Sequence, residues 1–260
     1  MAAIVGRRVV FCLTVLPNIL ANACAAHVTE IGGVRLRRVQ ASSNLPWVLE
    51  ADWEATAAAA AATDKKEGDG IDSHDPLSSC YWPAAAALAR TLGALNGGDA
   101  ARSYLELGCG TGLVSLTAAA CGARSVLATD VSSTSLQYTA AAADEQGLTA
   151  VTTSIFDATD LAVPLPHADV LLLSDVFVTD ALAVSFAARV AEAVDGGAFL
   201  RVLVVDPGRS TRDTFLTALA AHGVRHDGFM EEAALVAHAR QGNRVCLLDT
   251  SEGTPVSYCI

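Results

Sequence analysis

The sequence predicts an α/β fold built on a doubly wound, mostly parallel sheet, and two observations carry this prediction. From residue 103 onward, short apolar runs alternate with segments of helix length. Continuous β-type runs separated by helices indicate a parallel sheet that is covered on both faces. The chain has 260 residues, of which 52% are hydrophobic, so it can bury one sizeable core. We therefore expect one main domain, with ligands at the carboxyl ends of the strands.

The predicted elements follow one another along the second half of the chain. A helix is expected at 84–95, because Pro83 occupies its first turn, where a missing N–H costs nothing. Apolar and periodic patterns then predict strands and helices in alternation. The strands are expected at 103–107, 125–129, 151–155, 170–173, 199–205 and 244–248, and the helices between them at 113–121, 133–146, 181–194 and 211–222.

The first hundred residues have a different character. Residues 1–27 contain two arginines and the apolar run 9–20 but no acidic residue, which is typical of a targeting leader; a start codon chosen upstream of the true protein is the alternative. The apolar run is too short to span a bilayer, so no membrane span is expected. We expect residues 28–100 to form an N-terminal extension with a low-complexity insertion at 57–70, and residues 101–260 to form the main domain.

Charge and cysteine usage narrow the function. The net charge is −11, yet the first 40 residues carry +4, so the remainder carries −15. Such an acidic body repels phosphate backbones, and no nucleic-acid partner is expected; a cationic protein segment or a small molecule suits it better. The seven cysteines are scattered and form no Cys-x-x-Cys pair, which favours a reducing compartment and no metal site.

A glycine-rich segment lies between the first strand and the first helix of the predicted sheet, and it reads Glu106-Leu-Gly-Cys-Gly-Thr-Gly112. Glycines let the backbone pass close to a ligand whose polar groups meet the N–H groups of a helix start. The third glycine falls one position earlier than in the dinucleotide fingerprint. The segment resembles motif I of the class I methyltransferases. A dinucleotide enzyme and a purely structural turn are the alternatives.

This resemblance implies that the cofactor is S-adenosylmethionine. Its positive sulfonium and amino groups tolerate a nearby carboxylate, which a pyrophosphate would not. The resemblance places five residues of the segment against the cofactor, namely Glu106, Gly108, Cys109, Gly110 and Gly112.

Polar residues follow the next predicted strands. Asp130 ends the second strand, 22 residues after Gly108, and we expect it to accept hydrogen bonds from ribose hydroxyls; the alternative is a helix cap before Ser132. Asp157, just past the third strand, stands where methyltransferases place a residue toward the adenine amino group; an ordinary turn aspartate is the alternative.

The fourth strand closes with Leu173-Ser-Asp-Val-Phe177. We expect Asp175 in the acceptor pocket beside the transferable methyl group, and Ser174 against the cofactor; a helix or turn cap is the alternative for Asp175. Two further segments have plain structural explanations when taken alone. Tyr81-Trp82-Pro83 is compatible with core packing, and Asp206-Pro-Gly-Arg209 with a tight turn.

Taken together, these segments resemble the seven-strand lysine methyltransferases of the methyltransferase-16 group. The likeness runs over most of residues 30–250, and the combination of Tyr-Trp-Pro at 81–83 with Asp-Pro-Gly-Arg at 206–209 is its narrowest feature. Within the group, the chain most resembles the enzymes that methylate the β-subunit of electron transfer flavoprotein. Other matching segments are Val34-Arg-Leu-Arg37, His74-Asp-Pro76, Leu105-Glu-Leu-Gly-Cys-Gly110, Asp175-Val-Phe177 and Asp180.

The resemblance implies methyl transfer to lysine ε-amines of a protein partner by a monomeric enzyme. It places Trp82 against the cofactor and makes Asp175, Asp206 and Arg209 the catalytic residues. Electron transfer flavoprotein β-subunit is the implied partner, and the mitochondrial matrix the implied location, with a plastid or the cytoplasm as alternatives.

One departure lies at the end of the fourth strand. Where the group has Asp-x-x-Tyr or Glu-x-x-Tyr, this chain reads Asp175-Val-Phe-Val178. One lost neutral hydrogen bond is worth about 0.5–1.5 kcal/mol, so Val178 predicts slower or redirected chemistry and not an inactive enzyme. Two other functions stay open, a small-molecule N-methyltransferase and a non-catalytic regulator that binds S-adenosylmethionine.

Overall fold

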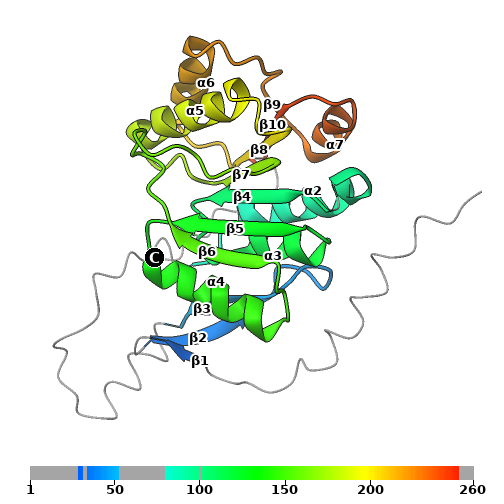
Figure 1. Cartoon of the computed structure of the whole chain (residues 1–260), viewed down its shortest axis with the longest axis vertical. Coiled ribbons are helices and arrows are strands. Elements are labelled where there is room, and N and C mark those ends of the chain that lie inside the picture. Colours follow the sequence, from blue (N-terminus) through cyan, green and yellow to red (C-terminus); the bar gives the residue numbers. More distant parts are fainter. Residues whose placement is uncertain (1–28, 32–33, 53–79, 100, 252–260) are drawn as a thin grey trace, which may run out of the picture.

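Figure 1 presents the computed structural model of the chain, which describes residues 29–31, 34–52, 80–99 and 101–251. The predicted leader at 1–27 and the predicted insertion at 57–70 lie outside the described residues. Within the described part of the chain, no helix is both long enough and apolar enough to cross a membrane.

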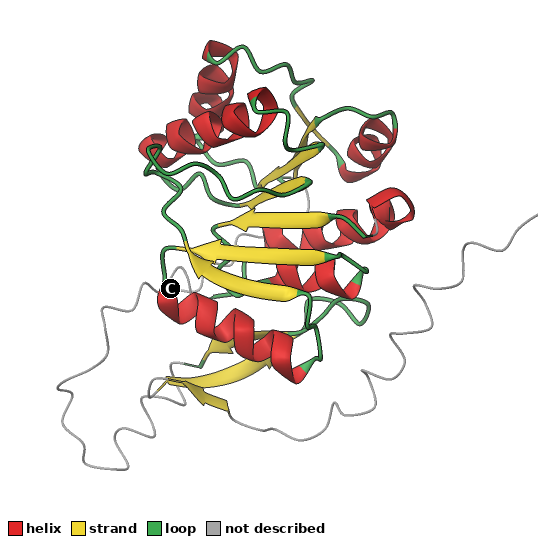
Figure 2. Cartoon of the chain, in the orientation of Figure 1, coloured by secondary structure: helices red, strands yellow, loops and turns green. Residues whose placement is uncertain are grey.

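The core of the molecule is a seven-stranded sheet with the order β6-β5-β4-β7-β8-β10-β9 (Figure 2). Every neighbouring pair in this sheet is parallel. The predicted Rossmann-like α/β fold is therefore confirmed. The strands are β4 (Ser103–Leu107), β5 (Ser125–Asp130), β6 (Val151–Ile155), β7 (Val170–Ser174), β8 (Arg201–Asp206), β9 (Phe229–Met230) and β10 (Val245–Asp249).

Helices cover both faces of this sheet. One face carries α5 (Asp180–Asp195) and α6 (Arg212–Ala221); the other carries α2 (Pro83–Asp99), α3 (Leu113–Ala120), α4 (Ser133–Glu145) and α7 (Glu232–Arg240). Alternation along β4 divides the core between them. Leu105 and Leu107 pack in the cluster of α5 and α6, whereas Tyr104 packs with α2 and α3. Both faces are buried, as a parallel sheet requires.

The structure departs from the sequence prediction at two places. The short strand β9 and the helix α7, between α6 and β10, were not predicted. Because β10 lies between β8 and β9 in the sheet, the chain turns back toward the centre after β9. A right-handed crossover then places α7 on the same face as α2, where the two helices meet.

A second, antiparallel sheet was also not predicted. It is formed by β1 (Thr29–Ile31), β2 (Val34–Val39) and β3 (Val48–Ala51), in that order. It packs on α4 at the end of the molecule nearest β6 (Figure 1). The Gln146 side chain, at the end of α4, accepts from the Trp47 backbone N–H at 3.2 Å and donates to its carbonyl oxygen at 2.9 Å. The extension is thus fastened to the main sheet through α4.

The strand order indicates where a ligand is expected to bind at the edge of the main sheet. The order reverses between β4 and β7, and ligands of open parallel sheets bind outside the carboxyl ends of the strands at such a switch point. Leu107 pairs with Leu173, so the loops that begin at Gly108 and Ser174 leave the sheet side by side. The glycine segment and the Ser174–Asp175 segment are therefore neighbours.

Candidate cofactor and acceptor site

The glycine loop after β4 has a backbone that only glycine adopts easily. Gly108, Gly110 and Gly112 have φ values of 71°, 51° and 79°, all in the left-handed region that L-residues with side chains disfavour. Space is limiting as well. A Cβ on Gly112 would lie 2.4 Å from Cγ2 of Thr139 in α4, and one on Gly108 would lie 3.0 Å from Cγ1 of Val176. The course of the loop at the carboxyl edge of the sheet therefore requires glycine at these positions.

Glu106 lies beneath this loop and is 1% exposed. Its Oε2 accepts from the Ser115 backbone N–H at 2.9 Å and from the Ser115 hydroxyl. Helix α3 begins after Gly112, which supplies no side-chain cap, so Glu106 satisfies a free N–H of the first turn. Burial raises its pKa to about 8, the Ser115 hydrogen bonds oppose this rise, and Asp130 adds to it. At neutral pH the carboxyl group is therefore mostly protonated unless a cation lies close by.

Asp130, at the end of β5, holds the glycine loop. Its Oδ2 accepts from the Gly110 N–H at 2.9 Å, and its Oδ1 accepts from the Ser132 N–H at 2.9 Å. The helix cap of α4 is Ser132 itself, whose hydroxyl accepts from the Ser135 N–H. Asp130 therefore ties the glycine loop to the start of α4, and its predicted contact with ribose hydroxyls stays a prediction.

Cys109 and Ser174 differ in how they can meet a ligand. The Cys109 side chain is buried with Ala128 and Leu136, and its N–H donates to the Thr129 carbonyl at 2.9 Å. The thiol therefore belongs to the core. Ser174, at the end of β7, has a buried hydroxyl with no hydrogen-bond partner in the described residues. Such a group costs free energy unless a ligand or water satisfies it.

Asp157 follows β6 and is exposed. Its Oδ1 accepts from the backbone N–H and the hydroxyl of Thr159 at 2.8 and 2.7 Å, and these bonds lower its pKa. It thus closes a local turn, which begins beside the end of β5, because the Phe156 N–H donates to the Asp130 carbonyl at 3.1 Å. Sequence reasoning missed two apolar neighbours here, Val131 and Ile155, whose exposed fractions are 64% and 57%. The sequence did contain a sign of this apolar surface, because Val131 directly follows Asp130 at the end of a predicted strand.

The loop between β6 and β7 is held from below by Arg189 of α5, which is fully buried. Its guanidinium donates to the carbonyl oxygens of Ala158, Asp160 and Val163 at 2.9, 2.6 and 2.9 Å. This arginine also forms an ion pair with Glu192 at 2.6 Å. The loop carries Asp157, so one buried cation fixes the course of the chain after β6.

Three predicted residues from distant parts of the sequence come together beyond β7 and β8. Arg209 Nε donates to Asp175 Oδ1 at 2.5 Å, and the Arg209 guanidinium lies 5.9 Å from the centre of the Trp82 ring. We name this set, Trp82, Asp175 and Arg209, the acceptor cluster. Asp175 has a φ of 58°, a strained conformation that is concentrated at functional sites. Its backbone N–H donates to the Val205 carbonyl at 3.0 Å, which locks this turn to β8.

The Asp175 carboxylate has opposing influences on its ionisation. Its side chain is 5% exposed, and this burial raises its pKa. The hydrogen bond and charge of Arg209 work against that rise, while Asp206 reinforces it. An incoming cation would favour the ionised form in the same way as Arg209 does. The cluster is thus suited to hold an amine, although Asp175 already shares its charge with Arg209.

Asp206 anchors the loop after β8, and the structure puts it below the acceptor cluster. It is fully buried, and its Oδ1 accepts from the N–H groups of Gly208 and Arg209 at 2.8 and 3.0 Å. Its Oδ2 is buried and has no partner in the described residues. Direct contact with an acceptor substrate is therefore not supported by this geometry, and we interpret Asp206 as the residue that positions Arg209.

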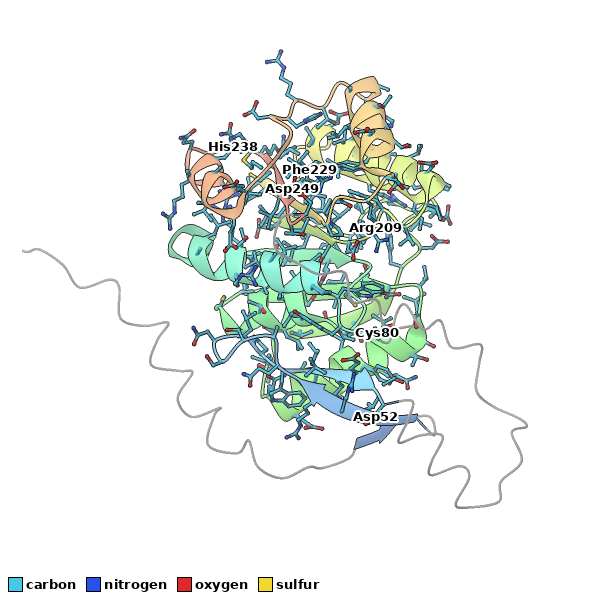
Figure 3. All side chains as sticks on the ribbon, turned by 180° about the vertical axis from the view of Figure 1, so that it is seen from behind. Asp52, Cys80, Arg209, Phe229, His238 and Asp249 are labelled. Atoms are coloured by element: carbon cyan, nitrogen blue, oxygen red, sulfur yellow. The ribbon has the colours of Figure 1, made fainter. Side chains whose placement is uncertain are left out.

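Arg212, in the first turn of α6, was missed by sequence reasoning. Its Nε donates to Asp206 Oδ1 at 2.7 Å, and its two Nη atoms bind Asp249 at 2.9 and 3.0 Å. The guanidinium also lies 4.3 Å from the centre of the Phe229 ring. This Asp206–Arg212–Asp249 network, with the Phe229 ring, joins the ends of β8, β9 and β10. Figure 3 labels Phe229 and Asp249, which come from β9 and β10. The acidic residue Asp249, at the end of the last strand, was the sequence feature from which a basic partner such as Arg212 could have been predicted.

Val178 stands where the resembling group has a tyrosine. Its side chain is 42% exposed, one residue before Thr179, whose hydroxyl caps α5 by accepting from the Leu182 N–H. The side chain thus occupies open space at the carboxyl edge. Among the residues that the structure describes, no three histidine, cysteine, aspartate or glutamate side chains are grouped to hold a metal ion.

Comparisons with known proteins agree with this site. Residues 105–197 match the family described as "Methyltransferase domain". No curated protein matches the chain. Among solved structures, a putative RNA methyltransferase from Pyrococcus horikoshii is 17% identical, with a TM-score of 0.45 over 60% of this chain and 76% of that chain.

Two further solved structures are similar to parts of this chain. The cyclase SpnF is 22% identical with a TM-score of 0.40 over 60% of each chain, so this chain spans about 60% of the length of that relative. A Trypanosoma brucei PRMT1 enzyme–prozyme complex with AdoHcy is 29% identical with a TM-score of 0.28, over 32% of this chain and 26% of that chain. These likenesses leave the acceptor open. Residues 105–197 are thus similar to a methyltransferase domain, and this likeness supports S-adenosylmethionine as the cofactor.

Proposed function

We propose that the chain transfers a methyl group from S-adenosylmethionine to lysine ε-amines of a protein. The single observation that carries the proposal is the acceptor cluster. Asp175 and Arg209 leave adjacent strand ends next to the glycine loop, and Trp82 closes the cluster. The sequence features with the narrowest resemblance to lysine methyltransferases, at 81–83, 175–177 and 206–209, thus converge on one place.

The glycine loop, Glu106, Asp130 and Ser174 suit the cofactor. Val176 and Thr139 leave no space for side chains at Gly108 and Gly112, which keeps the loop in its tight turn. The buried Ser174 hydroxyl, which has no partner among the described residues, offers a polar contact. The carboxyl group of Glu106 favours a positive ligand. When bound, S-adenosylmethionine supplies an electrophilic methyl group.

The chain's own residues must then orient a neutral amine. A lysine with a pKa of about 10.4 must lose its proton at pH 7, which costs roughly 4.6 kcal/mol. Correct orientation can contribute about 7–11 kcal/mol, so positioning outweighs deprotonation and water can take the proton. Asp175 is placed to accept a hydrogen bond from the amine N–H and to direct its lone pair toward the methyl group. Arg209 fixes the Asp175 carboxylate in turn.

The acidic surface supports a protein acceptor. The chain carries a net charge of −11, which attracts a basic segment and disfavours a phosphate backbone. Electron transfer flavoprotein β-subunit is the first protein to test, because the sequence resembles the enzymes that methylate it. We also propose a mitochondrial location on the basis of the acid-free first 27 residues.

The proposal is tested by incubating the full chain with labelled S-adenosylmethionine and either electron transfer flavoprotein β-subunit or a fractionated lysate, followed by mapping of the labelled residue. Asp175→Asn keeps the size of the side chain and removes its charge. We expect its transfer rate to fall by about tenfold to a thousandfold, or about 1.4–4 kcal/mol. Calorimetry should show unchanged cofactor affinity.

Asp195→Asn, an exposed carboxylate at the end of α5, is the matched control and should keep the parent rate. If Asp175→Asn methylates lysine as fast as the parent, the acceptor site lies elsewhere. If the label appears only on small molecules of the lysate, the protein-lysine proposal is wrong.

A further inference from the structure

A second cavity opens at the carboxyl edge of the sheet, on the other side of the loop that carries Arg209. Its volume is about 610 Å³, within the range of ligand pockets. It lies between the start of α2, the turn from β9 into α7, and the end of β10. Tyr81, Met230, Glu231, Leu248 and Ser251 line it.

We propose that this cavity binds a lysine or arginine side chain of the substrate protein, a few residues from the lysine that is methylated. This inference rests on the proposed function, because the cavity would act as a specificity subsite of the same enzyme. The occupant is a basic residue with a long aliphatic stem, held within a segment of a partner protein.

Proximity to the acceptor cluster is the first argument. Tyr81 lines the cavity, while the next residue, Trp82, lies against Arg209. Ser251 lines the cavity as well, and a Cβ on Gly208 would lie 2.9 Å from the Ser251 Cβ. The cavity therefore adjoins the loop that carries Arg209. An extended peptide advances about 3.3–3.6 Å per residue, so a residue near the target lysine reaches the cavity.

Charge is the second argument. The cavity is lined by three carboxylates, Glu231, Glu232 and Asp249, and by one cation, Arg90. Arg90 lies 3.5 Å from Glu232, and Asp249 is bound by Arg212. The Glu231 side chain has no ion-pair or hydrogen-bond partner among the described residues, and it does not cap α7. One carboxylate at the cavity is thus left for an external cation.

The shape of the remaining lining fits a basic side chain better than a small cation. Ala86, Ala87, Met230 and Leu248 present apolar surface. Lysine and arginine bury their methylene stems along such surface while the charged head stays polar and partly wet. An acidic or phosphorylated segment is disfavoured, because it would meet the carboxylate of Glu231 while the nearby arginines are already paired with Glu232 and Asp249.

The chain's own C-terminus is a poor occupant. It continues from Ser251 to residue 260 with Glu252 and without lysine or arginine. The segment before Cys80 does contain Lys65 and Lys66, so the chain itself offers one competing source of a cation. The experiment includes a variant that separates this source from a partner protein.

The test measures binding and needs no turnover. The probe is a fluorescein-labelled nonapeptide with one central lysine, leucine beside it and arginine three positions away, titrated by anisotropy into the full chain loaded with S-adenosylhomocysteine. A second peptide has citrulline in place of arginine. We expect the arginine peptide to bind at least tenfold more tightly than the citrulline peptide. Glu231→Lys should remove this difference and leave the citrulline peptide unchanged.

Asp144→Lys makes the same charge change on exposed α4 and is the matched control. Equal binding of the two peptides by the parent chain would overturn the inference, as would an equal loss in Asp144→Lys and Glu231→Lys. So would a tenfold gain of arginine-peptide binding in Lys65→Ala/Lys66→Ala, because the chain's own lysines would then be the occupant. If peptide binding depends on Glu231 but no lysine is ever methylated, the proposed function fails while the cation subsite stands.

Discussion

The two halves of the site are built by different means. The cofactor half, made of Glu106, the glycine loop and Asp130, uses backbone N–H groups and buried hydrogen bonds, most of them within one contiguous stretch. The acceptor half, made of the acceptor cluster and the Asp206–Arg212–Asp249 network, uses ion pairs between residues far apart in sequence. The first half therefore depends on local conformation, and the second on the assembled sheet.

Their electrostatics differ accordingly. In the cofactor half, burial raises the pKa of Glu106, and its hydrogen-bond partner among the described residues is the uncharged Ser115. A positive ligand nearby would lower this pKa. In the acceptor half, Arg209 and Arg212 already balance Asp175, Asp206 and Asp249. Perturbation of the cofactor half should thus change cofactor binding and the pH dependence of stability, and perturbation of the acceptor half should change stability and transfer.

The largest expected effect is a pH dependence from the cofactor half. The pKa of Glu106 is about 8 in the folded chain against an ordinary value of 4.5. Between these values the folded state binds a proton that the unfolded state has lost. The free energy of unfolding should therefore fall as pH rises through this window, by about 5 kcal/mol in total for this group. Urea unfolding at several pH values measures it, with Glu106→Gln as the variant that lacks the titration.

Cofactor binding should also change the protonation of Glu106. The positive charge of S-adenosylmethionine favours the carboxylate, so binding at pH 7 should release a proton, and affinity should rise with pH up to about 8. Calorimetry in two buffers of different ionisation enthalpy counts released protons. An identical heat in both buffers would show that Glu106 does not respond to the ligand.

The next effect belongs to the acceptor half. Arg212→Met leaves the fully buried Asp206 and the Asp249 carboxylate without their shared cation. Removal of one partner from a buried ion pair costs about 3–5 kcal/mol, which denaturant unfolding should detect. Arg225→Met, which replaces an exposed arginine, is the control and should cost little. If both variants unfold alike, the network does not stabilise the acceptor half.

A smaller effect separates the halves by ligand binding. Asp130→Ala removes the acceptor for the Gly110 N–H and for the expected ribose hydroxyls. Hydrogen bonds to charged groups are worth about 1.5–3 kcal/mol, so cofactor affinity should fall at least tenfold by calorimetry. Asp144→Ala, on the exposed side of α4, should bind as the parent does. Unchanged affinity in Asp130→Ala would remove the ribose assignment.

The smallest effect is a gain. Val178→Tyr restores the hydroxyl that the resembling group carries, in a position that is 42% exposed. One neutral hydrogen bond is worth about 0.5–1.5 kcal/mol, so lysine transfer should rise by up to about tenfold. Val178→Phe adds the ring without the hydroxyl and should not reproduce the gain. Equal rates in all three proteins would mean that this position does not touch the acceptor.

The same contrast explains what the sequence could predict. The glycine loop, Glu106 and Asp130 lie on local patterns whose spacing reflects a strand, a turn and a helix, and all were located correctly at the carboxyl edge. The six predicted strands also match the structure to within about two residues at each end, the usual uncertainty of boundaries.

The missed features depend on tertiary placement. Strand β9 has only two residues, which are too few to show the alternation of apolar and polar residues that predicts a strand. Arg212 and Asp249 are 37 residues apart in sequence, and they meet only because β10 inserts between β8 and β9. The burial of Asp206 follows from the same insertion, so its positioning role was not visible in the Asp-Pro-Gly-Arg pattern. The left-handed backbone of Asp175 likewise depends on its hydrogen bond to β8.

The insertion of β10 has a consequence for how the protein is made. The last strand in the described part of the chain, β10, is an interior strand of the sheet, paired on both sides, and it brings Asp249 to Arg212. A nascent chain that has emerged only as far as α6 already carries β4–β8 and the glycine loop. Since domains generally fold as units during synthesis, such a chain lacks the strand that completes the acceptor half. Assembly of the acceptor half is therefore expected only after β10 has been synthesised, and chains truncated before β10 should lack the Arg212–Asp249 ion pair.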